Sequence, residues 1–92
     1  MFIKPDREVV LAVGDSMSPC IPDQSKLYLE DAKYIKIGDV INYYSPLFNE
    51  SIAHRVIDID ETYYYVAGVN SCTERVPRNQ NIKKVVGVEF PQ

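Results

Sequence analysis

The feature that most constrains the fold of this chain is that its apolar residues never keep a helical period over the length of a helix. An amphipathic helix repeats apolar residues every three to four positions, and no segment does so. Instead, short apolar or alternating segments are separated by Gly, Pro, Asn and Asp, the residues of tight turns. We expect strands at residues 8–13, 27–30, 40–44, 52–59, 62–67 and 85–90. This arrangement predicts an all-β domain, built as a small coiled and partly closed β-sheet.

The sequence also predicts the form of two connections and the two faces of the longest strand. Residues 31–36 fit either a helical turn or a loop, and residues 68–81 read as a polar loop containing Pro77. Strict alternation along the strand at 52–59 gives one of its faces four side chains. Those are Ile52, His54, Val56 and Asp58.

Composition indicates one small folded domain over residues 1–92, with a thin core. The chain is 46% hydrophobic and 25% charged, as in ordinary globular proteins. Its formal net charge of −3 offers no basic surface, so we expect no nucleic-acid partner. No apolar run near the start approaches a signal-peptide core or a membrane span. We therefore expect a soluble, cytoplasmic protein without a membrane span of its own, although a partner could recruit it to a membrane.

Neither a metal site nor a cofactor site is expected. The two cysteines, Cys20 and Cys72, make neither a disulfide framework nor a zinc site. We expect two reduced, semi-buried thiols, and a bond between them is the alternative. The sequence has no Gly-rich phosphate loop and no paired His/Cys metal spacing.

The segment from Val13 to Pro19 contains the first candidate for chemistry. An apolar run stops at Gly14, and Ser16 follows in a turn rich in Gly, Asp, Ser and Pro. A strand that ends in such a turn can hold a hydroxyl clear of the sheet, with backbone N–H groups beside it. A serine nucleophile needs that arrangement. The same residue types also form ordinary turns.

His54 is the one histidine of the chain and the candidate general base for Ser16. Imidazole has an ordinary pKa of about 6.5, so it is mostly neutral at pH 7 and can accept the hydroxyl proton. The alternative is a half-buried histidine bonded to a backbone carbonyl. Asp58 lies four residues along the same strand, about 13 Å away, which is too far to orient the ring. An orienting acid must come from elsewhere, and the candidates are Glu74 and Asp39.

Five short motifs follow one another in an informative order. They are Gly14-Asp15-Ser16-Met17-Ser18-Pro19, Gly38-Asp39-Val40-Ile41, His54-Arg55-Val56, Gly68-Val69-Asn70 and Val86-Gly87-Val88. In this order and spacing, over about residues 10–90, the chain resembles the clan of type I signal peptidases and self-cleaving repressors. The bacterial members have a lysine base at the position of His54. With a histidine at this position, the chain resembles the archaeal and endoplasmic-reticulum branch of the clan.

The resemblance implies a signal-peptidase-like catalytic core with serine endopeptidase activity. Ser16 would be the nucleophile and His54 the base, and an acyl-enzyme would form. The oxyanion hole and substrate-binding positions would be Asp15, Met17 and Pro19, beside Ser16. The substrate would be an extended peptide or protein tail that adds a strand at the sheet edge.

The chain departs from the family pattern at two positions. Val69 stands where the family often has an acid, and Arg75 stands where the histidine branch usually has another. Glu74 lies one position early and is our candidate third catalytic residue. The departures support an alternative function, a catalytically inactive module that binds peptides or other proteins. A self-cleaving regulator is a further alternative, although few residues precede Val9.

Overall fold

The computed structural model describes residues 8–14, 21–32, 34–69 and 72–91. These ranges contain seven β-strands and no helix, which confirms the all-β prediction. The strands are β1 (Glu8–Leu11), β2 (Lys26–Asp31), β3 (Val40–Ser45), β4 (Glu50–Ile59), β5 (Tyr63–Ala67), β6 (Glu74–Pro77) and β7 (Lys83–Glu89). The described ranges therefore contain no helix that is long and apolar enough to cross a membrane.

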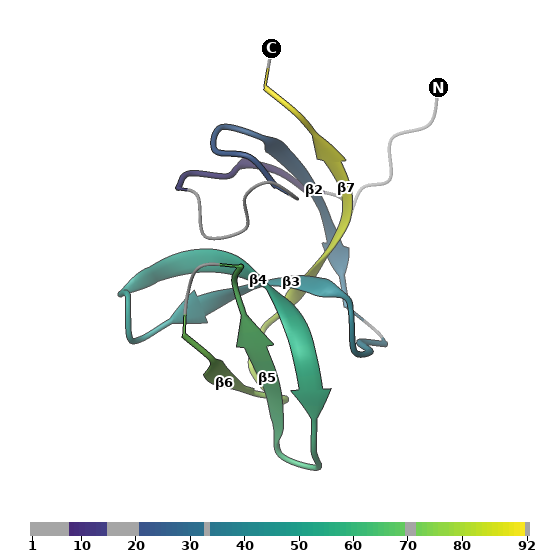
Figure 1. Cartoon of the computed structure of the whole chain (residues 1–92). Helices are drawn as coiled ribbons and strands as arrows, with labels where there is room; N and C mark the ends of the chain where they lie inside the picture. Colours follow the sequence, from purple (N-terminus) through teal and green to yellow (C-terminus); the bar gives the residue numbers. More distant parts are fainter. Residues whose placement is uncertain (1–7, 15–20, 33, 70–71, 92) are drawn as a thin grey trace.

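The strands form one antiparallel sheet in the order β1-β2-β7-β3-β4-β5-β6. Within the described residues, β1 and β6 are the two edges and do not pair with each other, so the sheet is not closed. Strand β7 pairs along β2 and then with β3 at Lys83 and Lys84. Figure 1 shows that β7 thereby joins an upper group, β1 and β2, to a lower group, β3 to β6.

After β2 the structure has the loop that was one of the two expectations for residues 31–36, and it corrects the expectation for residues 68–81. Residues 32 and 34–36 form an irregular loop, and Asp31 ends β2. The expected polar loop at 68–81 instead contains β6, a four-residue edge strand with Val76 as its one fully buried side chain. So short a strand leaves little alternation to read in the sequence. Pro77 is tolerated there because an edge strand has one side without ladder hydrogen bonds.

The expected faces of β4 are correct only as far as Val56. A bulge shifts the register against β5 between Val56 and Asp58, so the alternation reverses. Asp58 is exposed, and Ile59 packs against the core with Ile52.

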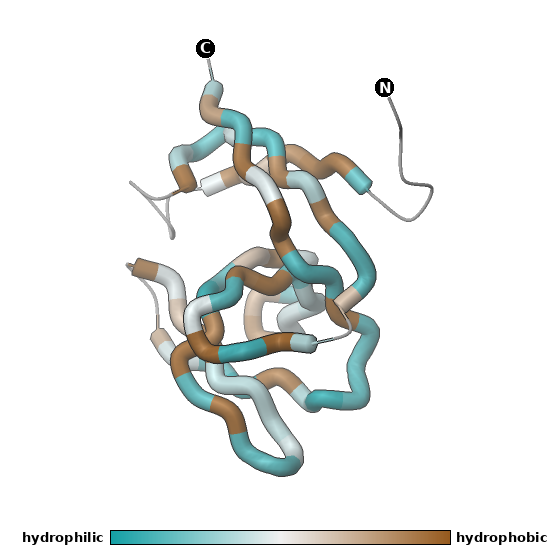
Figure 2. The backbone as a smooth tube through the Cα atoms, turned by 90° about the vertical axis from the view of Figure 1, so that its right-hand side faces the viewer, coloured by the Kyte–Doolittle hydropathy of each residue, from teal (hydrophilic) through white to brown (hydrophobic). Residues whose placement is uncertain are grey.

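Two hydrophobic clusters form the core, one on each side of the β3–β4 hairpin. The first lies on the inner face of β3 to β6. It contains Ile41, Tyr43, Val56, Tyr64, Val66, Val76 and Ile82. The second contains Ile21, Leu27 and Leu29, and the opposite face of the hairpin reaches it through Val40 and Ala53. Figure 2 shows the resulting alternation of hydrophobic and hydrophilic residues along the strands. The hairpin is therefore the central element of the molecule, with both of its faces packed.

Candidate active site

The proposed nucleophile and its neighbours, Asp15, Ser16, Met17 and Pro19, lie outside the described residues. The structure does describe both ends of the segment that carries them. On one side, the N–H of Gly14 donates to Asp23 Oδ1 at 2.7 Å. The φ angle of Gly14 is +103°, which glycine adopts without steric cost. On the other side, Ile21 is buried in the second cluster. Gly14 and Ile21, the described residues that flank the segment, are thus both held by contacts with the rest of the fold.

Gly14 is one of the residues that line a groove of about 360 Å³. One wall is formed by residues 10–14, and the other by residues 50–53 at the start of β4. Both walls have a strand edge without a ladder partner among the described residues, because β1 pairs with β2 alone and β5 pairs with β4 only from Arg55 onward. Ile21, Leu27 and Asn42 complete the lining. The groove therefore offers backbone donors and acceptors above an apolar floor.

His54 lies on the inner face of β4, opposite Ile41 of β3. Only 2% of its surface is exposed. Its Nδ1 atom is 3.3 Å from the Tyr43 hydroxyl, and the two rings meet edge to face with centroids 6.3 Å apart. The imidazole is therefore buried in the core, with one ring nitrogen directed at a phenol.

Glu74 reaches the same phenol from β6. Its Oε1 atom accepts a hydrogen bond from the Tyr43 hydroxyl at 2.8 Å. The Ser45 hydroxyl, 3.0 Å from Oε1 and 2.7 Å from Oε2, donates to the same carboxylate. Ser45 in turn accepts from the Phe48 N–H at 3.3 Å. Glu74 and His54 are thus connected through Tyr43.

Strand alternation explains why these side chains meet. Glu74 lies across from Val66, which lies across from Val56, so Glu74 faces the core. Arg75, one position on, points to the other face, where its guanidinium stacks 4.6 Å from the Tyr63 ring centre. Glu74 is therefore the acid of β6 that lies near the imidazole.

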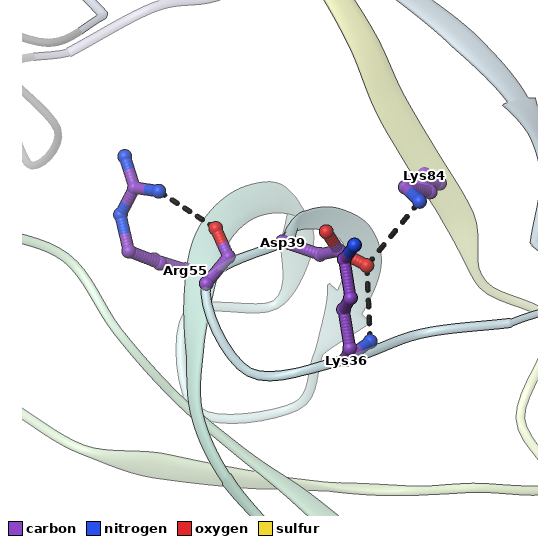
Figure 3. Close-up of polar contacts among 5 residues, drawn as sticks. Lys36, Asp39, Arg55 and Lys84 are labelled. Carbon is purple, nitrogen blue, oxygen red and sulfur yellow. Dashed lines mark hydrogen bonds and ion pairs between the residues drawn. The ribbon is translucent and has the colours of Figure 1, made fainter.

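The other candidate acids are engaged away from His54. Asp39 accepts from the Lys36 N–H at 3.0 Å and pairs with Lys84 at 3.3 Å, as Figure 3 shows. These contacts hold the turn before β3. Asp58 is exposed and accepts from the N–H of Ile59. Val69 is 55% exposed, so the position where the family often has an acid faces solvent here.

The electrostatics favour a neutral imidazole. Burial lowers the pKa of His54 below its ordinary value, because an imidazolium loses its hydration there, and the charge of Glu74 opposes part of this shift. Burial and the bond to Glu74 raise the pKa of Tyr43 well above its ordinary range. The phenol therefore keeps its proton and serves as a neutral hydrogen-bond donor.

Sequence reasoning missed Tyr43 and Ser45. Tyr43 and Ser45 alternate with Ile41 onto one face of β3. Because Ile41 lies opposite His54, the β3–β4 register places that face beside the histidine, and this register is not readable from the sequence. The expected strand ended at residue 44, which left Ser45 out. Cys72 is a free thiol but is exposed, which corrects the expectation that it is semi-buried, and Cys20 lies outside the described residues.

The described residues of the site can hold a neutral base and orient its ring. No group of three metal-binding side chains occurs in the described part of the chain. The sequence matches no model of a known protein family and no curated protein.

Proposed function

We propose that this protein is a signal-peptidase-like serine endopeptidase that cleaves an extended peptide or protein tail. One observation carries the proposal. The only histidine of the chain is buried, is favoured in its neutral form and is connected to a carboxylate through a phenol. The unclosed antiparallel sheet and the position of Gly14 at the end of the first strand region support the same assignment.

In the proposed mechanism, the Ser16 hydroxyl attacks the carbonyl carbon of the scissile peptide bond while His54 accepts its proton. Backbone N–H groups near Ser16, including that of Asp15, stabilise the oxyanion. The tetrahedral intermediate collapses as His54 returns the proton to the leaving amine, and an acyl-enzyme remains. Water, deprotonated by His54, then hydrolyses the ester and regenerates Ser16.

The groove between residues 10–14 and 50–53 is the proposed substrate site. An extended peptide lying there would add a strand between two strand edges that have no ladder partner within the described ranges, with main-chain hydrogen bonds providing affinity. The floor, formed by Ile21 and Leu27, favours apolar side chains over charged ones. Gly14 lines the groove and directly precedes the segment that contains Ser16, so a peptide bound in the groove would lie near that segment.

A fluorophosphonate probe, which reacts with activated serines, tests the proposal. We expect one covalent adduct by intact mass, lost in Ser16→Ala and reduced at least about 100-fold in rate in His54→Ala. Ser18→Ala is the matched control, because it removes a neighbouring hydroxyl of the same segment and should label normally. Cleavage of extended peptides should follow the same order. Labelling that survives Ser16→Ala, or an unlabelled wild type, would overturn the proposal.

The second candidate is a catalytically inactive module that binds peptides through the same groove. The observation in its favour is that, among the described residues, the acid nearest to His54 reaches it only through Tyr43. Loss of the orienting acid from a serine-protease triad costs about 10⁴ in rate. Peptide binding in the groove together with an unreactive Ser16 would establish this function.

A further inference from the structure

We propose that Tyr43 is a positioning residue that holds neutral His54 in the tautomer with Nδ1 protonated, so that Nε2 carries the lone pair. The catalytic consequence, a base directed at Ser16, rests on the proposed function. The tautomer itself follows from the hydrogen bonds of the buried cluster formed by Tyr43, Ser45, His54 and Glu74.

The Ser45 hydroxyl donates to the Glu74 carboxylate. It accepts from the Phe48 N–H, a group that can only donate. Its own proton lies within reach of both oxygens of Glu74, at 3.0 and 2.7 Å. Oε1 also receives the Tyr43 hydroxyl at 2.8 Å. Both carboxyl oxygens therefore accept hydrogen bonds from the hydroxyls of Ser45 and Tyr43.

The Tyr43 hydroxyl has a single proton and two neighbours that could accept it, Glu74 and His54. A hydrogen bond to a carboxylate is shorter and stronger than one between neutral groups. The distances agree, since the phenol oxygen is 2.8 Å from Glu74 and 3.3 Å from His54 Nδ1. The proton therefore goes to Glu74, and the phenol oxygen is left to accept from the imidazole.

The contact with Tyr43 decides which nitrogen of the neutral His54 ring carries the proton. A neutral ring has one protonated nitrogen and one with a lone pair. Because Nδ1 faces an acceptor, Nδ1 carries the proton and Nε2 carries the lone pair. Tyr43 is 2% exposed and packed within the first cluster, so its hydroxyl cannot swing away from this position. The negative charge of Glu74 also stabilises, through the phenol, the imidazolium that forms during proton transfer.

The test is nitrogen NMR of the imidazole at a pH where His54 is neutral. The chain has one histidine, so one pair of ring-nitrogen signals reports the tautomer without assignment by mutation. In the wild type we expect the Nδ1–H form to dominate. Tyr43→Phe keeps the ring but removes the acceptor, and should shift the population at least several-fold toward Nε2–H. Tyr44→Phe is the matched control, because the exposed Tyr44 bonds Asn49 instead, and it should leave the ratio unchanged.

Glu74→Gln provides an independent variant. A side-chain amide can donate to the phenol oxygen, which turns the phenol proton toward Nδ1 and should favour the Nε2–H form. A wild-type ring in the Nε2–H form would overturn the inference, whether or not the variants fold. So would an unchanged tautomer ratio in a folded Tyr43→Phe protein.

Probe labelling separates this inference from the proposed function. If the positioning inference and the proposed function are both correct, Tyr43→Phe should lower the rate of Ser16 labelling about tenfold or more, because His54 loses an orienting group. If the wild type shows the Nδ1–H form but never labels, the positioning inference stands and the peptidase proposal fails. If the wild type labels and Tyr43→Phe changes neither the tautomer nor the rate, the inference fails and the peptidase proposal stands.

Discussion

At the scale of single residues, the behaviour of the site depends on the protonation of His54. Burial penalises the imidazolium, and the nearby Glu74 carboxylate opposes that penalty without overcoming it, so the pKa of His54 lies below its ordinary value. A general base must be neutral before it can accept a proton, and a lowered pKa extends the pH range in which it is neutral. The same shift links the charge of this residue to the stability of the fold.

We expect His54 to make the protein less stable as the pH falls. In the unfolded chain, His54 binds a proton near pH 6.5, whereas in the folded protein it does so only at lower pH. Between these two values the unfolded state binds more protons. The contribution of His54 to the free energy of unfolding therefore decreases with falling pH and levels off below the folded pKa. Urea unfolding at closely spaced pH values from 7.5 to about 5 measures this slope.

His54→Gln is the control for that experiment, because glutamine does not titrate. It should flatten the slope just below pH 6.5 while leaving the steeper loss at lower pH, where carboxylates are protonated. A wild-type protein that gains stability as the pH falls from 7.5 to 6 would contradict the direction of the shift.

At the scale of the elements, the positions of chemical groups are decided by strand pairing and by the ends of strands. The pairing of β3 with β4, and of β5 with β6, brings the buried cluster together from residues far apart in the sequence. The segment that carries Ser16 is instead anchored at its ends. Ala12 exchanges backbone hydrogen bonds with Gln24 and Ser25, both at 2.7 Å, and Gly14 donates to the Asp23 carboxylate. Asp23 is therefore the side chain that holds Gly14, directly before the segment that contains Ser16.

We expect Asp23→Ala to slow Ser16 labelling by up to about 100-fold, because misplacing a nucleophile by about 1 Å can cost that much. Asp23 is exposed, so the free energy of unfolding should change by less than about 1 kcal/mol. Asp23→Asn is the matched control, since its amide oxygen can still accept from the Gly14 N–H, and it should label nearly as fast as the wild type. Equal labelling by Asp23→Ala and the wild type would show that this anchor does not position the nucleophile.

At the scale of the whole molecule, the sequence predicts the kind of fold and most of its strands, because alternation and turn residues are local signals. It does not predict what depends on pairing. The bulge after Val56 reverses the outer half of β4, and β6 is too short to show a pattern. The acid near His54 could be named from the sequence as Glu74, yet its connection through Tyr43 depends on three neighbouring strands and on the register that joins them.

Among the described strands, the two edges of the open sheet, β1 and β6, differ in their capacity to accept another strand. The β1 edge borders the groove and ends in exposed aliphatic side chains, Leu11 and Val13. The β6 edge has four residues and includes Pro77, which lacks an N–H and discourages pairing. An added peptide strand is therefore expected at the groove and not at β6.

Hydrogen exchange on the Ser16→Ala protein, which should bind without cleaving, measures this preference. An extended peptide rich in alanine and valine should slow exchange of backbone amides in residues 10–14 and 50–53, while residues 74–77 serve as the internal control. At about 100 times its Kd, such a peptide should stabilise the fold by about 2.7 kcal/mol. The stabilisation should appear as a higher midpoint of urea unfolding. Protection centred on β6 would show that the peptide does not bind in the groove. So would a saturating peptide that leaves both walls of the groove, residues 10–14 and 50–53, unprotected.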